Sequence, residues 1–156
     1  MAKADHSDQS CGAMSDIHPG ISRVCEGYKR AVHDKDVEAF LNLYDPSARV
    51  FDTWGVWSYE GEKERRKVIE GWFSSLGDER VAVTFDRLEI LVTGDLATLS
   101  ARVVFVALSA AGVELRGMQN RLTWVLSPEG DDWKILHEHT SVPIGFTDLK
   151  GMLQRD

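Results

Sequence analysis

The sequence has few cysteines and no long apolar run, and each lack excludes a class of protein. Only Cys11 and Cys25 are cysteines among 156 residues, which excludes a disulfide framework and the paired spacing of zinc sites. No apolar run approaches the roughly 20 residues that span a bilayer, and the N-terminus lacks the apolar stretch of a secretory signal. We therefore expect a cytoplasmic protein with no membrane partner, in which Cys25 is a small buried side chain.

Basic residues are also too few for a nucleic-acid partner. The formal net charge is -7 and the sequence pI is about 5.2, whereas such a partner requires clustered Lys and Arg on one face. Hydrophobic residues make up 43% of the chain and charged residues 28%, which is the balance of a folded globular protein. The length is that of one domain.

The N-terminal part of the chain divides into a leader and two helices. Residues 1–20 are rich in Asp, Ser, Gly and Ala without apolar periodicity, which predicts a flexible leader. A helical stripe then follows at steps of three and four residues: Ile21, Val24, Cys25, Tyr28, Ala31 and Val32. Asp36 is predicted to cap a second short helix, which Asp45-Pro46 ends.

The remaining elements are one short strand, one helix and four longer strands. Residues 49–53 read as a strand that carries Asp52, and residues 62–76 read as a helix with Arg65 among its outward charges. Turn signals then separate four predicted strands, at residues 81–92, 97–108, 113–126 and 133–142. In the first of these strands the apolar phase shifts between Phe85 and Leu88, as in a β-bulge that bends the sheet.

This order of elements predicts an α+β fold. A helical hairpin and a third helix are expected to pack on a strongly curved antiparallel sheet, giving a cone-shaped domain with an internal pocket. Residues 146–156 are expected to form a C-terminal tail.

Two segments carry a resemblance to known families. The stretch from Tyr28 to Asp52, YKRAVHDKDVEAFLNLYDPSARVFD, resembles the opening hairpin and first strand of ketosteroid isomerase-like and SnoaL-like proteins. The stretch WKILHEHTS, residues 133–141, resembles the final strand of SnoaL-like domains and of the association domain of calmodulin-dependent kinases. The resemblance implies a SnoaL-like pocket domain over residues 21–145, within the nuclear transport factor 2-like superfamily, and a homodimer.

The resemblance also implies catalytic residues. Tyr28 matches the isomerase tyrosine that donates a hydrogen bond to the substrate oxygen, and Asp52 matches the carboxylate that moves the proton. The isomerase has a further, protonated acid late in its sheet, but no Asp or Glu lies between Leu115 and Pro128. Half of that oxyanion hole is therefore expected to be missing.

Amide and guanidinium groups stand where that acid is expected. Gln119, Asn120 and Arg121 occupy this part of the sequence, and a cation there favours a polar or anionic ligand over a neutral steroid. Arg121 shares a strand face with Gln119, which is either a polar pocket wall or a solvated outer surface. We expect Gln119 and Arg121 to bind the ligand.

Aromatic and imidazole side chains complete the predicted ligand site. Trp54 follows Asp52, and Trp72 lies on the helix that is expected to cover the cavity. His137 and His139 are two residues apart on a strand, so both are expected on one face, as polar pocket lining.

A metal site is the alternative reading of the two histidines. It requires a third ligand such as Asp52 or His33, which no spacing selects. Neither a metal nor a cofactor is predicted.

Two functions remain open from the sequence. The first is an isomerase or hydratase-type enzyme, in which Asp52 is the general base and Tyr28 the oxyanion donor for a polar organic substrate, with Arg121 and His137 orienting a polar substituent. The second is a noncatalytic ligand-binding or homodimerisation module with the same fold.

Overall fold

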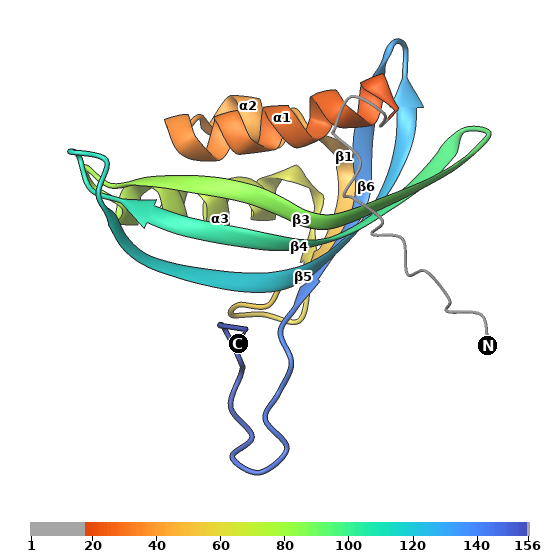
Figure 1. Ribbon diagram of the computed structural model, residues 1–156. Coiled ribbons are helices and arrows are strands. Elements are labelled where there is room, and N and C mark those ends of the chain that lie inside the picture. The colour runs from red at the N-terminus through yellow and green to blue at the C-terminus, as the bar shows by residue number, and fades with distance from the viewer. Residues whose placement is uncertain (1–17, 156) are drawn as a thin grey trace, which may run out of the picture.

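The computed structural model describes residues 18–155. These residues form three helices on one face of a curved sheet (Figure 1). The helices are α1 (Pro19–Asp34), α2 (Val37–Leu41) and α3 (Gly61–Ser75). The strands are β1 (Tyr44–Phe51), β2 (Tyr59–Glu60), β3 (Arg80–Thr93), β4 (Leu96–Leu108), β5 (Glu114–Glu129) and β6 (Asp132–Ser141). The predicted α+β class is confirmed.

The sheet is mixed, in the order β2-β1-β6-β5-β4-β3. β3 to β6 form the predicted antiparallel meander, but β1 lies parallel to β6. A purely antiparallel sheet was therefore the wrong expectation. Hairpin turns fix the direction of β3 to β6, whereas α3 and the whole meander separate β1 from β6, so that no local turn sets their relative direction.

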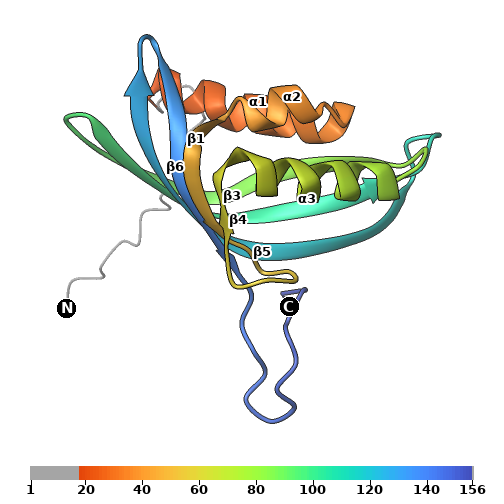
Figure 2. The same cartoon turned by 180° about the vertical axis from the view of Figure 1, so that it is seen from behind.

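The sheet bends around the helices, and Figure 2 shows its concave side facing α1, α2 and α3. Pairing between β3 and β4 shifts register between Asp86 and Glu89, and Arg87 in this gap has φ 53°. The β-bulge predicted from the apolar phase between Phe85 and Leu88 is confirmed. A bulge increases the local twist, and this allows the long strands to curl over a cavity.

The two N-terminal helices begin at identifiable caps. α1 starts at Pro19 rather than after Gly20, because proline suits the first helical turn and His18 Nδ1 accepts a hydrogen bond from the Gly20 amide at 3.2 Å. Residues 1–17 of the predicted leader lie outside the described residues. The predicted cap of α2 is confirmed, since Asp36 Oδ1 accepts from the Ala39 amide at 2.9 Å.

The predicted stripe of α1 is buried throughout, against apolar side chains from the central strands. Leu99, Leu126 and Ile135 in those strands have no exposed surface. Burial raises the pKa of the Cys25 thiol to about 12, so this side chain is an inert part of the core.

The expected C-terminal tail returns to the sheet. The Gln119 amide donates to the Leu153 carbonyl at 2.8 Å, and Gln154 Nε2 donates to the Gly117 carbonyl at 2.5 Å. These bonds occupy the edge of β5 beyond the end of β6. Within residues 18–155 no helix is long and apolar enough to cross a membrane.

Candidate functional site

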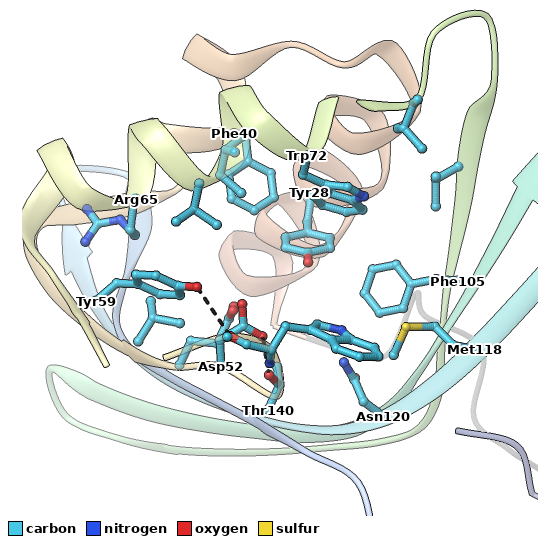
Figure 3. Close-up of a pocket in the computed structure, with 18 of the residues that line it drawn as sticks. Tyr28, Phe40, Asp52, Tyr59, Arg65, Trp72, Phe105, Met118, Asn120 and Thr140 are labelled. Carbon is cyan, nitrogen blue, oxygen red and sulfur yellow. Dashed lines mark hydrogen bonds between the residues drawn. The ribbon is translucent and has the colours of Figure 1, made fainter. Parts of the chain in front are cut away.

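A cavity of about 590 Å³ lies between the concave face of the sheet and the helices. Its walls are largely apolar, with Phe40, Val68, Ile69, Trp72, Phe105 and Met118 among the residues that line it. Figure 3 shows polar groups entering it from several elements, including Tyr28 from α1, Asp52 from the end of β1, and Asn120 and Thr140 from β5 and β6. Its size and lining suit a small organic molecule with a few polar atoms.

Tyr28 presents its hydroxyl group to this cavity (Figure 3). Its ring is fixed by Phe40 and Trp124, with centroids 5.1 and 5.5 Å away. No group within residues 18–155 forms a hydrogen bond with the hydroxyl. Burial first, and then the nearby Glu138 and Asp52 carboxyl groups, raise the pKa of Tyr28 well above 10.0. The side chain therefore remains a neutral phenol with a proton free to donate.

Asp52 lies at the end of β1, half-buried in the cavity wall. Its Oδ1 accepts a hydrogen bond from Thr140 Oγ1 at 3.1 Å. Thr140 Oγ1 in turn accepts from the Thr53 amide at 2.9 Å, which orients the threonine hydroxyl towards Asp52. The carboxylate is thus positioned by β6 yet remains within reach of a ligand.

Glu138 is a second acid in the cavity, and the sequence analysis missed it. Its Oε2 accepts hydrogen bonds from the Tyr44 hydroxyl at 2.7 Å and from Trp124 Nε1 at 2.6 Å. Burial raises the pKa of Glu138 above its ordinary value of 4.5, against these two bonds, which lower it. No Asp or Glu lies between Leu115 and Pro128 of β5, as the sequence indicates, and the second acid of the cavity comes from β6 instead.

A β-bulge explains both this omission and the wrong placement of the histidines. Ile135 pairs with Leu126 and His137 pairs with Val125, so Leu136 is an extra residue in β6. Strict alternation from Ile135 would place His137 inside, but the extra residue turns Glu138 inward instead.

His137 and His139 consequently lie outside the cavity lining. His137 Nδ1 is 2.8 Å from the Arg49 carbonyl oxygen, and the exposed His139 ring contacts Phe51 with centroids 5.6 Å apart. Both were expected to line the pocket, and this placement is corrected. No group of three His, Cys, Asp or Glu side chains within residues 18–155 could hold a metal ion.

Gln119 and Arg121 also lie outside the cavity lining, because Asn120 projects inward from the same strand. Arg121 is exposed, and its Nε donates to Ser141 Oγ at 3.1 Å. Of the two readings of this face, the structure therefore gives the outer surface, which corrects the expected pocket wall. The signal was present in the sequence, since apolar residues alternate along β5 at Leu122, Trp124 and Leu126 and Asn120 continues their phase.

Asn120 is 8% exposed, and its Oδ1 is buried without a hydrogen-bond partner. Trp54 and Trp72 both line the cavity, where the sequence analysis expected them. The Asn120 Nδ2 donor is not among the buried unpaired atoms, so it is a specific attachment point for a polar atom of a ligand in a largely apolar wall.

Arg65 is a further residue that the sequence analysis placed wrongly. It was expected to face outward from α3, but it is 3% exposed and lines the cavity. Its Nη1 and Nη2 donate to the carbonyl oxygens of Ala48 and Asp45 at 2.6 and 2.9 Å. Its position four residues before Ile69 places it on the buried face, which is the signal that could have identified it.

The raised pKa of Glu138 has a consequence for stability that Glu138→Gln tests. Above pH 4.5 the unfolded chain ionises this group while the folded chain retains the proton, so the free energy of unfolding falls as pH rises towards the folded pKa. Glutamine removes this term, and the variant should gain stability relative to the wild type as pH increases. Urea unfolding of both proteins from pH 4 to pH 8 measures the difference. A constant difference across this range would contradict the assignment.

Comparison with known proteins places this cavity in a recognised fold. A family model described as a SnoaL-like domain matches residues 21–145. An NTF2-like protein of unknown function from Pseudomonas putida KT2440 is 19% identical with a TM-score of 0.77, over 93% of this chain and 99% of that one. A putative aromatic ring hydroxylase from Novosphingobium aromaticivorans is 18% identical with a TM-score of 0.64, over 86% and 92% of the two chains. No curated protein sequence matches the chain.

Proposed function

The chain belongs to the SnoaL-like domain family, and from this premise we propose that its cavity binds a planar, largely apolar ketone and transfers a proton on it. The observation that carries the proposal is the convergence of two groups in one apolar cavity. Tyr28 offers an unpaired phenol proton, and Asp52 offers a carboxylate held by Thr140. A base and an oxyanion donor on opposite sides of a bound ketone are the components of an enolisation site.

In the proposed step Asp52 removes a proton from the carbon next to the ligand carbonyl. The C–H electron pair forms a carbon–carbon double bond, and the carbonyl electrons move to oxygen, where Tyr28 donates a hydrogen bond to the developing negative charge. Protonated Asp52 then returns a proton to the same carbon or to a conjugated one. The step needs no oxidant and no cofactor.

Asn120 takes the orienting role that the sequence analysis gave to Arg121 and His137. Those two residues lie outside the cavity lining, whereas Asn120 lines it, and its Nδ2 has no partner within residues 18–155 and is not among the buried unpaired atoms. A carbonyl or hydroxyl oxygen on the ligand can accept a hydrogen bond from this amide nitrogen. The proposed substrate is therefore a planar ketone with one further polar substituent.

The test is solvent exchange on β-tetralone, a two-ring ketone with acidic protons next to its carbonyl group. We expect the protein in D₂O to replace these protons with deuterium faster than buffer does, as followed by proton NMR. We also expect β-tetralone to raise the melting temperature, because a ligand that binds the native state stabilises it. A higher melting temperature without exchange would support the noncatalytic binding function, and the absence of both effects would overturn the proposal for this ligand class. The homodimer and the cytoplasmic location remain predictions.

A further inference from the structure

Glu138 is a buried carboxyl group in the cavity that the proposed enolisation does not use. It is 8% exposed and comes from β6, opposite Val50 of β1. Asp52 follows two residues after Val50 and is held by Thr140, two residues after Glu138. The two acids therefore enter the cavity from adjacent strands. Asp52 lies two residues further along the chain than Val50, the residue that pairs with Glu138.

The hydrogen bonds of Glu138 determine where it carries a proton. The Tyr44 hydroxyl and Trp124 Nε1 both donate to Oε2, at 2.7 and 2.6 Å. These two donors occupy the lone pairs of Oε2, so the proton of the neutral acid resides on Oε1. Oε1 has no hydrogen-bond partner within residues 18–155. Unlike Asn120 Oδ1, it is not one of the unpaired side-chain atoms that are fully buried. It is therefore the oxygen that a ligand can reach.

The surroundings of Glu138, burial above all, favour its neutral form. Burial raises the pKa of Glu138 first, and the Asp52 charge adds to that effect, while Tyr44, Trp124 and Arg65 oppose it. Two carboxyl groups in environments that differ in this way are suited to act as an acid and a base in one reaction.

We propose that Glu138 is a general acid that protonates a departing hydroxyl group, so that the cavity removes water from a β-hydroxy ketone. This inference rests on the proposed enolisation. Asp52 takes the proton next to the carbonyl, and its C–H electron pair becomes the new carbon–carbon double bond. The C–O bond at the neighbouring carbon breaks, and the Oε1 proton of Glu138 joins the leaving oxygen to form water. Proton transfer from Asp52 to Glu138 through solvent restores both groups, so atoms and electrons balance without a co-reactant.

The probe is 3-hydroxy-1-tetralone, a β-hydroxy ketone that loses water to give α-naphthol. Deuterium exchange next to its carbonyl reports on Asp52, and naphthol fluorescence reports on elimination. In Glu138→Gln the amide can still accept from Tyr44 and Trp124 but cannot release a proton as an acid, so we expect naphthol formation to fall about 100-fold or more relative to exchange. Glu138→Asp, which retains an acid, should recover part of this ratio, and the melting temperature of each variant checks folding.

The outcomes separate this inference from the proposed function. If the wild-type protein exchanges deuterium but forms no naphthol, or if Glu138→Gln retains the wild-type ratio, the role of Glu138 is overturned and the enolisation stands. A parallel loss of exchange and elimination in Glu138→Gln would make the residue structural. If the wild-type protein neither exchanges nor eliminates, the enolisation itself fails and the role of Glu138 fails with it.

Discussion

Asp52→Asn should reduce the proton exchange of β-tetralone by about 10²–10⁴-fold, the usual contribution of a positioned general base. This corresponds to about 2.7–5.4 kcal/mol of transition-state stabilisation. The amide is nearly the same size and its oxygen can still accept from Thr140 Oγ1, which donates to Asp52 at 3.1 Å in the native site. The asparagine amide cannot take up the substrate proton, so binding should persist while exchange is lost.

The control for this substitution is Asp95→Asn. Asp95 is an exposed carboxylate in the turn between β3 and β4, away from the residues that line the cavity. The Asp95→Asn variant should catalyse deuterium exchange of β-tetralone at the wild-type rate, and its melting temperature should be unchanged. If Asp52→Asn remained folded and exchanged within about threefold of the wild type, Asp52 would not be the base, because the loss would fall far below the range expected for general base catalysis.

Local signals in the sequence were sufficient to predict the three helices and the four strands of the meander. They did not predict β2, and β1 begins at Tyr44 rather than at residue 49. The three-to-four-residue spacing from Ile21 to Val32 fixed the buried face of α1, and Asp36 marked the start of α2. The parallel pairing of β1 with β6 has no such signal. It depends on which strand edge remains free after the meander has formed, and that is a property of the whole chain.

The candidate site was predicted in part. The errors concern which residues of β5 and β6 point into the cavity. Tyr28 was placed correctly because it belongs to the unbroken stripe of α1, and Asp52 because it directly follows β1, whose last residues keep a regular pairing with β6. Glu138 was missed because a single extra residue, Leu136, reverses the alternation of β6. Side chains of a strand alternate between the two faces of the sheet. One extra residue therefore reverses which side chains point inward along the rest of the strand.

Burial of charge was the other property that local patterns did not show. Arg65 belongs to a run of charged residues at the start of α3 that reads as a solvated face. It is buried because two carbonyl oxygens of the β1 backbone, from Ala48 and Asp45, accept from its guanidinium group. Such partners come from the tertiary fold, and a buried cation without them would be too costly to retain.

Trp124 links the core to the candidate site, and its replacement should have the largest effect on stability. The side chain has no exposed surface, and its ring centroid lies 5.5 Å from those of both Tyr28 and Phe85. Trp124→Ala leaves a large cavity in the core, and we expect it to lower the free energy of unfolding by about 3–5 kcal/mol. Urea unfolding at neutral pH measures this change.

Trp124→Phe separates packing from hydrogen bonding at the same position. Phenylalanine fills much of the space but removes the Nε1 donor that lies 2.6 Å from Glu138 Oε2, so the cost of that bond should be about 1–3 kcal/mol on top of the lost volume. One lone pair of Oε2 then becomes free, and the Glu138 proton is no longer restricted to Oε1. The ratio of naphthol formation to deuterium exchange should therefore fall in Trp124→Phe even when the variant is fully folded. If the free energy of unfolding of Trp124→Ala were within about 1 kcal/mol of the wild-type value, Trp124 would not support the core. If the ratio were unchanged in Trp124→Phe, Trp124 would not orient Glu138.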